Sequence, residues 1–420
     1  MPTAEFDLPG HHIDVPPVPA TDFPERGQPE DDVLTEVRRR FERNRFALEK
    51  NFSITYSGIP SSISRKIDGM AAGRYFVEWA GFRPGPSDFE AGSESGTMSM
   101  EREAVGMMAS LLGKPDASGF ITTGGTESNL ASMRLARNNG GQAEPEIVAP
   151  VTMHFSFRLG AELMKIKLVE VDVDDDTYVP RMEDVEKAIT PRTVGLVCSA
   201  PGGNFGTMDP IEAFADLAWR KGLYLHVDAA FGGFILPFMR DLGHPVPPFD
   251  LSLKGVSSIM TDGHKLGLLP IATGFFIARD SSLFETIPTE RTLIHTTSST
   301  KPGSRAAGAW ATFRNLGRDG YRQSTAHVLK LRDIIADGVT AMPGMAIAAP
   351  RFISVVGFTS RTINLQDVHN HMAEDGWGQG YGTIRGKPFI RLSIHPSRDE
   401  EHAHGFVKAF ETAVARARRV

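Results

Sequence analysis

Short apolar runs alternate with amphipathic segments through the middle of the chain, and turn residues separate most of them. Apolar runs of about four to eight residues are typical of buried strands, whereas apolar positions that recur every three or four residues are typical of helices covering a sheet. The alternation therefore predicts βαβ units and a mostly parallel sheet with helices on both faces. Strands are expected at 119–125, 146–152, 167–173, 193–200 and 223–230, with helices at 126–137, 156–164, 182–189 and 210–222 between them.

The pattern on either side of this region is different. Two apolar runs, 256–261 and 271–278, predict further strands that flank the segment DGHKLGLLP. A helix with a mostly apolar face is expected over 98–112, because Gly113 and Pro115 follow it as stop signals. After residue 300 a long helix is expected near 304–340, followed by strands at 352–360 and 388–395.

These changes suggest three parts of the chain. The first 32 residues are rich in proline and acidic residues, and a helical pattern begins only at Asp31 or Asp32. The segment 51–97 contains too many glycines and serines for an element to be predicted. We expect an N-terminal arm and helix over 1–50, a large α/β domain over 51–300, and a smaller α+β domain over 301–420.

The composition argues against nucleic acid and anionic lipid as binding partners. The chain is 41% hydrophobic and 23% charged with a net charge of -6, so it offers no basic field for nucleic acid or anionic lipid. Neither a secretory signal nor a run of ~20 apolar residues is present, and a cytoplasmic location is expected. The single cysteine, Cys198, stands in the apolar run TVGLVCSA, which predicts a buried strand residue and not a nucleophile.

Candidate chemistry begins with TTGGTESN at 122–129, where a predicted strand meets a predicted helix. Two glycines let the backbone approach a ligand closely, and a helix start presents free N–H groups that suit a phosphate. The motif lacks the lysine of a nucleotide P-loop, so a monophosphate fits it better than a nucleotide. A glycine-rich turn with no ligand is an equally good interpretation of this motif alone.

Two further motifs follow predicted strands. In HVDAAFGGF, Asp228 ends an apolar strand and could face a cation such as a protonated pyridine nitrogen, or it could cap a helix or form an ion pair. The small Ala230 beside it would let a flat ring lie close. In DGHKLGLLP, Lys265 follows His264; a partly desolvated lysine loses its proton more readily and suits Schiff-base chemistry, although most lysines are solvated charges.

Together these signals describe how an enzyme anchors pyridoxal phosphate (PLP). In this order the motifs resemble the group II PLP decarboxylase family of fold type I, which includes archaeal tyrosine/aspartate decarboxylases and sphingosine-1-phosphate lyases. The resemblance extends from about residue 50 to the C-terminus. It implies a large PLP-binding domain and a smaller C-terminal domain, a Schiff base on Lys265, and Asp228 at the pyridine nitrogen.

The resemblance also implies roles for other residues. Gly125, Thr126 and His264 would hold the phosphate, and His154 in VTMHFSF would stack on the cofactor ring. In STKPGSRAAG, Gly303 and Ser304 would approach the phosphate from the neighbouring subunit of a homodimer.

The substrate side of the site is less well defined. Arg391 in FIRLSIHP would meet the substrate carboxylate, although a strand-edge arginine on the surface fits the sequence as well. Decarboxylases of this group commonly carry a tyrosine before the GSR motif, and residues 266–320 contain none. His295 is a candidate acid in its place, and Tyr56 and Tyr75 are the other candidate proton donors and substrate contacts.

The reaction expected is α-decarboxylation of an L-amino acid, which releases carbon dioxide and an amine. The alternative is retro-aldol cleavage of a phosphorylated or hydroxylated amine, as in the lyases, because SAPGGNFGTMDPIE resembles that branch. A third hypothesis is a silent homologue that only binds PLP. No metal site is expected, because pairs such as His369 and His371 would point to different faces of one helix.

Overall fold

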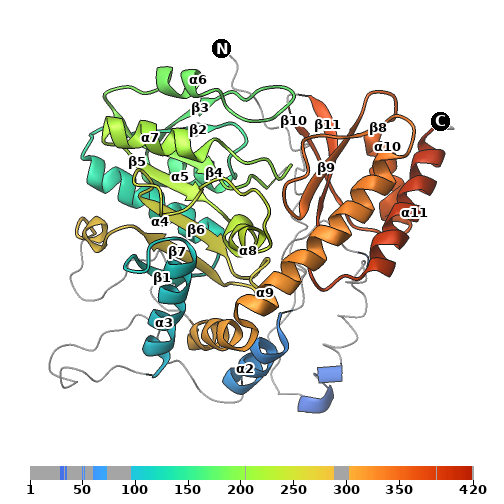
Figure 1. Ribbon diagram of the computed structural model, residues 1–420, viewed down its shortest axis with the longest axis horizontal. Coiled ribbons are helices and arrows are strands. Elements are labelled where there is room, and N and C mark those ends of the chain that lie inside the picture. Colours follow the sequence, from blue (N-terminus) through green and yellow to red (C-terminus); the bar gives the residue numbers. More distant parts are fainter. Residues whose placement is uncertain are drawn as a thin grey trace.

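The computed structural model divides the described chain into a large seven-stranded sheet and a small four-stranded sheet, each with its own helices (Figure 1). The N-terminal arm and most of the helix predicted after Asp31 lie outside the described residues, as do Tyr56, Tyr75 and His295. The described residues are 29–32, 34–35, 50, 52, 60–72, 96–203, 205–287, 302–384 and 386–418.

The large sheet is mostly parallel, as the sequence predicts. Its strand order is β1-β7-β6-β5-β4-β2-β3, and only β7 runs against its two neighbours. Consequently β1, β2, β4, β5 and β6 all end at the same edge. The strands are β1 (Ser118–Thr122), β2 (Glu146–Pro150), β3 (Lys167–Val171), β4 (Thr193–Ser199), β5 (Tyr224–Asp228), β6 (Ser258–Asp262) and β7 (Gly274–Ala278).

Helices cover both faces of this sheet. Along β4, Leu196 and Cys198 pack into one hydrophobic cluster and Val197 into another, because successive side chains of a strand point to opposite faces. Cys198 is fully buried, as predicted, and burial raises the pKa of its thiol. Helix α7 (Ile211–Lys221) packs on the first face and α4 (Gly125–Gly140) on the second. The other helices here are α3 (Gly96–Leu111), α5 (Ser156–Met164), α6 (Met182–Lys187) and α8 (Leu236–Asp241).

The small sheet is antiparallel, with the order β10-β11-β9-β8, and α10 (Leu365–Glu374) and α11 (Glu400–Ala417) accompany it. Two of its strands were not predicted. β8 (Met345–Ile347) is only three residues long, and β10 (Gly380–Ile384) contains two glycines in five residues, which weakens any strand signal. The predicted strands correspond to β9 (Val355–Ser360) and β11 (Lys387–Ser393).

Helix α9 (Gly303–Thr340) joins the two parts. It packs against α3 and α2 (Ser62–Ala72) in the large part and against α11 in the small part (Figure 1). Its 38 residues are interrupted at Gly317, whose φ of 56° lies in the left-handed region that favours glycine. None of the helices in the described ranges combines the length and the apolar character needed to cross a bilayer.

Candidate active site

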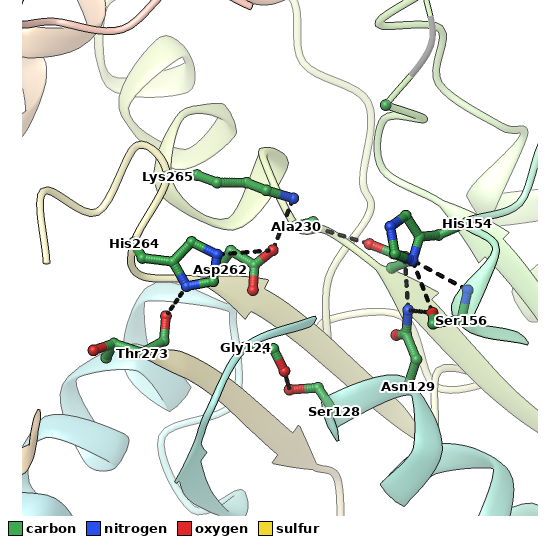
Figure 2. Close-up of polar contacts among 12 residues, drawn as sticks. Gly124, Ser128, Asn129, His154, Ser156, Ala230, Asp262, His264, Lys265 and Thr273 are labelled. Carbon is green, nitrogen blue, oxygen red and sulfur yellow. Dashed lines mark hydrogen bonds and ion pairs between the residues drawn. The ribbon is translucent and has the colours of Figure 1, made fainter. Parts of the chain in front are cut away.

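The predicted site residues of the large domain meet at the edge where the parallel strands end. Asp228 is the last residue of β5, and Lys265 follows β6 by three residues. His154 follows β2, and Gly125 opens α4 directly after β1. Figure 2 shows Lys265 and His264 on one side of this edge and His154 on the other, with Asn129 below His154.

Lys265 forms a buried ion pair that the sequence analysis did not predict. Its Nζ lies 2.8 Å from Oδ2 of Asp262, and the two side chains are only 12% and 4% exposed. The same ammonium lies 4.5 Å from the centre of the Phe231 ring. Although burial alone would raise the pKa of Asp262, Lys265 and His264 hold it below its usual value. Oδ1 of Asp262 is buried and has no hydrogen-bond partner within the described structure.

Asp262 could have been found from the sequence. Asp262 is the last residue of the apolar strand β6, and Asp228 is the last residue of the apolar strand β5. An acidic residue at the end of an apolar strand was the signal that identified Asp228. Asp262 stands three residues before Lys265, inside the motif already identified.

Asp228 is buried and accepts two hydrogen bonds. The Nδ2 of Asn129 donates to its Oδ2 at 3.1 Å, and the backbone N–H of Ala230 donates to its Oδ1 at 3.1 Å. In the described part of the chain no ion pair involves Asp228, and it caps no helix. Both alternative interpretations from the sequence therefore fail. A buried carboxylate held only by N–H donors suits a cation that comes from outside the chain, such as a protonated ring nitrogen.

The turn before α4 is shaped to bring its backbone close to a ligand. Gly124 has a φ of 135°, and a Cβ on it would lie 2.9 Å from Cε1 of His264. A Cβ on Gly125 would lie 2.5 Å from Cε of Met260 and 3.0 Å from Oδ2 of Asp262. No side chain caps α4, so the N–H groups of its first turn face outward, and Thr126 lies among them. This arrangement fits a phosphate.

The two histidines of the site are held by different contacts. Nδ1 of His264 lies 2.9 Å from the carbonyl oxygen of Thr273, to which it donates. His154 is exposed to solvent, and its Nδ1 lies 2.8 Å from Oγ of Ser156. Partial desolvation lowers the pKa of both rings, which favours their neutral forms at neutral pH. An exposed neutral imidazole at this edge can lie against a bound aromatic ring.

Two residues of the C-terminal part, one on β11 and one just after it, lie near the site. Arg391 on β11 is flanked across the sheet by Gly380 and Gly357, and its Nη1 donates to the carbonyl oxygen of Gly203 at 3.0 Å. Its positive charge helps to lower the pKa of His154, after desolvation. Arg391 is therefore half-buried near the edge and is not a surface arginine.

The second of these residues, His395, was not predicted. Its Nε2 lies 3.2 Å from the backbone oxygen of Lys265, and burial lowers its pKa to about 4. Nothing in its local sequence distinguishes it from an ordinary core histidine, so only the fold reveals this contact.

Gly303 and Ser304 begin α9. Within this chain the adjacent residues Pro302 and Arg305 line a small pocket together with Thr122 and Thr123. A contribution of Gly303 and Ser304 to a second subunit remains a prediction. Among the described residues no group of three or more histidine, cysteine, aspartate or glutamate side chains is arranged to hold a metal ion.

The chain is similar to several known proteins along most of its length. An L-aspartate decarboxylase of Thermococcus kodakarensis is 34% identical over 393 residues, which cover 92% of this chain and 97% of that protein. A probable L-tyrosine/L-aspartate decarboxylase of Methanothermobacter thermautotrophicus is 36% identical over 321 residues, 75% of this chain and 87% of the other. The structure of a Burkholderia pseudomallei sphingosine-1-phosphate lyase matches with a TM-score of 0.84 and 26% identity, over 95% of this chain and 94% of that one.

These similarities extend across both sheets and confirm fold type I, with its large mostly parallel domain and small C-terminal sheet. Residues 88–361, which include TTGGTESN, HVDAA and DGHK, match the pyridoxal-dependent decarboxylase conserved domain. The chain therefore belongs to the pyridoxal-dependent decarboxylase family, and it is a carbon–carbon lyase whose cofactor is pyridoxal phosphate.

Proposed function

We propose that the enzyme removes the α-carboxylate of an L-amino acid with an acidic side chain, and that L-aspartate is its first substrate to test. The observation that supports this best is the meeting of Lys265, Asp228 and His154 at one sheet edge, with Arg391 arriving from the other sheet. Two similar proteins act on L-aspartate by name, which supports the choice of substrate.

Each residue at this sheet edge has a proposed role in holding the cofactor or the substrate. Bound PLP supplies an electron sink that stabilises the negative charge left on the substrate Cα when carbon dioxide departs. Lys265 provides the amine that holds the cofactor, and Asp228 keeps a proton on the ring nitrogen. Gly125, Thr126 and His264 hold the phosphate.

On the substrate side, His154 would lie against the ring of bound PLP, the small Ala230 would leave room for that ring, and Arg391 would bind a substrate carboxylate in bidentate fashion. His295, Tyr56 and Tyr75 remain the candidates for returning a proton to Cα, and all three lie outside the described residues. We place His154 and His295 with Lys265 among the residues that act on the reacting atoms.

The wider organisation is also part of the proposal. The large PLP-binding domain spans 51–300, the smaller domain spans 301–420, and the arm and helix over 1–50 precede them. We propose a homodimer in which Gly303 and Ser304 contact the phosphate held by the partner subunit. We further propose that the enzyme acts in the cytoplasm.

Retro-aldol cleavage is the second candidate reaction. The observation that favours it is the similarity to the Burkholderia lyase. That protein is 26% identical, and the match covers 95% of this chain. The substrate would then be a phosphorylated or hydroxylated amine, and the product would be an aldehyde.

A substrate panel separates these reactions. The PLP-loaded enzyme is incubated with L-aspartate, L-glutamate, L-tyrosine and a phosphorylated β-hydroxy amine, and carbon dioxide and aldehyde are both measured. Carbon dioxide from L-aspartate, absent with Lys265→Ala, is the expected result. Aldehyde release without carbon dioxide would replace our proposal with the lyase reaction, and a stable visible absorption band without either product would indicate a silent homologue.

The glycine turn offers a sharp test of phosphate binding. Gly125→Ala is expected to weaken PLP binding on the order of tenfold, because the added Cβ presses on Met260 and on the Asp262 carboxylate. The dissociation constant is measured by titrating the apoenzyme with PLP. Gly106→Ala in α3 is the matched control, since a Cβ there meets nothing within 4 Å, and it should leave PLP affinity unchanged. Equal affinities in the two variants would show that the turn does not hold the phosphate.

A further inference from the structure

A continuous set of hydrogen bonds joins the buried Asp228 to the exposed His154, and the buried Asn129 lies at its centre. One Nδ2 hydrogen of Asn129 is donated to Oδ2 of Asp228 at 3.1 Å, and the other to Oγ of Ser156 at 2.9 Å. Ser156 in turn contacts Nδ1 of His154 at 2.8 Å (Figure 2). Asn129 and Ser156 are completely buried.

The side-chain oxygen of Asn129 is also hydrogen-bonded. Its Oδ1 lies 3.0 Å from Nε2 of His226, whose Nδ1 lies 2.7 Å from Oγ of Ser258. The hydroxyl of Tyr224 donates to the same Ser258 oxygen at 2.7 Å. Burial lowers the pKa of His226 to about 3, so this ring is neutral at neutral pH and carries one N–H.

The donor and the acceptor of each hydrogen bond in this network can be assigned from the chemistry of its groups. An amide oxygen only accepts, so Nε2 of His226 must carry the hydrogen and its Nδ1 must accept from Ser258. With its oxygen occupied in this way, the amide of Asn129 can present only N–H groups to Asp228 and Ser156. The hydroxyl of Ser156 accepts from Asn129, and because the backbone N–H of Ser156 also donates to Nδ1 of His154, that nitrogen is an acceptor and receives the hydroxyl hydrogen as well.

Two consequences follow at the cofactor edge. The carboxylate of Asp228 receives a donor on each oxygen, one from Asn129 and one from the backbone, and the two bonds fix its orientation. Nδ1 of His154 also faces the backbone N–H of Ser156 at 3.4 Å, so this nitrogen carries no hydrogen. The neutral His154 ring must therefore have its hydrogen on Nε2.

We propose that Asn129 is a positioning residue that sets two groups at once: it holds Asp228 as an oriented carboxylate for the cofactor ring, and through Ser156 it fixes the Nε2–H tautomer of His154. The inference rests on the roles proposed above for Asp228 and His154. It goes beyond them because it assigns a function to a helix side chain that need not touch the cofactor or the substrate.

Asn129→Asp is the most direct test, because it keeps the size of the side chain and the acceptor for His226 but replaces both donors with an oxygen. PLP is expected to bind on the order of tenfold to a hundredfold more weakly, since a charge-assisted hydrogen bond is lost and a second carboxylate faces Asp228. In the apoenzyme, nitrogen NMR of ¹⁵N-histidine-labelled protein should show His154 change from the Nε2–H tautomer. His154→Gln assigns the signal.

Two further variants distinguish a positioning role of Asn129 from a general loss of stability. Ser156→Ala keeps the donor to Asp228 and removes the hydroxyl contact with His154, leaving only the longer backbone N–H contact at 3.4 Å, so the share of the Nε2–H tautomer should fall while PLP affinity falls by less than about threefold. Ser132→Ala is the matched control, because Ser132 is buried on the same helix and its hydroxyl donates only to the backbone oxygen of Asn129. It should change neither measurement.

If Asn129→Asp fails to fold, Ser156→Ala still tests the tautomer. An unchanged His154 signal in Ser156→Ala, or wild-type PLP affinity in a folded Asn129→Asp, would overturn the inference. Both measurements are independent of turnover. If the wild-type enzyme bound PLP but released no carbon dioxide, only the proposed reaction would fail.

Discussion

Replacing Lys265 with alanine is expected to reduce carbon dioxide release by about a thousandfold or more, because the amine that holds the cofactor is lost. Release is measured with PLP in excess, so that weaker binding is not mistaken for lost chemistry. Borohydride treatment followed by peptide mapping should attach the vitamin B6 group to Lys265 in the wild type and to no residue in the variant.

The ion pair with Asp262 requires a specific control. Removing the ammonium leaves a buried carboxylate without its counterion, which costs about 3–5 kcal/mol of stability. The double variant Lys265→Met/Asp262→Asn removes both charges and should recover most of that loss in a denaturant titration. If the double variant is folded and inactive, the missing activity belongs to the amine. Substantial carbon dioxide release from either variant would refute the role of Lys265.

Asp228→Asn is expected to lower kcat by on the order of 10²–10³-fold, because a neutral amide no longer holds a proton on the ring nitrogen. The side chain keeps its size and its one oxygen can still accept from the backbone N–H of Ala230, so the fold should survive although the Nδ2 of Asn129 loses its acceptor. The absorption of bound PLP as a function of pH should also change, since the charge beside the ring has been removed.

Asp250→Asn is the matched control for this variant. Asp250 is equally buried and accepts hydrogen bonds from the backbone and side chain of Ser252, but it lies outside the site. Its replacement should lower stability and leave kcat and the PLP spectrum as they are. A kcat in Asp228→Asn close to that of Asp250→Asn would show that the carboxylate at 228 has no special role.

Local signals in the sequence were sufficient for the large sheet and for its main site residues. Each strand was a short apolar run bounded by turn residues, and the residues directly after β1, β2 and β5 were therefore easy to single out. Parallel strands place such residues at one edge, which singled out Asp228 from the residues alone, whereas His154, four residues after β2, was assigned to the site only through the family resemblance.

Contacts between distant parts of the chain could not be predicted in this way. The contact of His395 with the turn that carries Lys265 joins residues 130 positions apart. The glycines that flank Arg391 are recognisable only from the register of the small sheet. Asn129 belongs to the phosphate motif, yet its partners lie on β5 and at the start of α5.

The hydrogen bond from His395 to the backbone of Lys265 means that the C-terminal part supports the turn that carries Lys265. Nδ1 of His395 faces the N–H of Ser397, so its Nε2 is the donor, and at neutral pH the ring is uncharged. A fragment that ended near residue 300 would retain the amine of Lys265 and the carboxylates of Asp228 and Asp262, but it would lack the hydrogen bond from His395. Heating that melts the small sheet first should therefore release PLP before the large sheet unfolds.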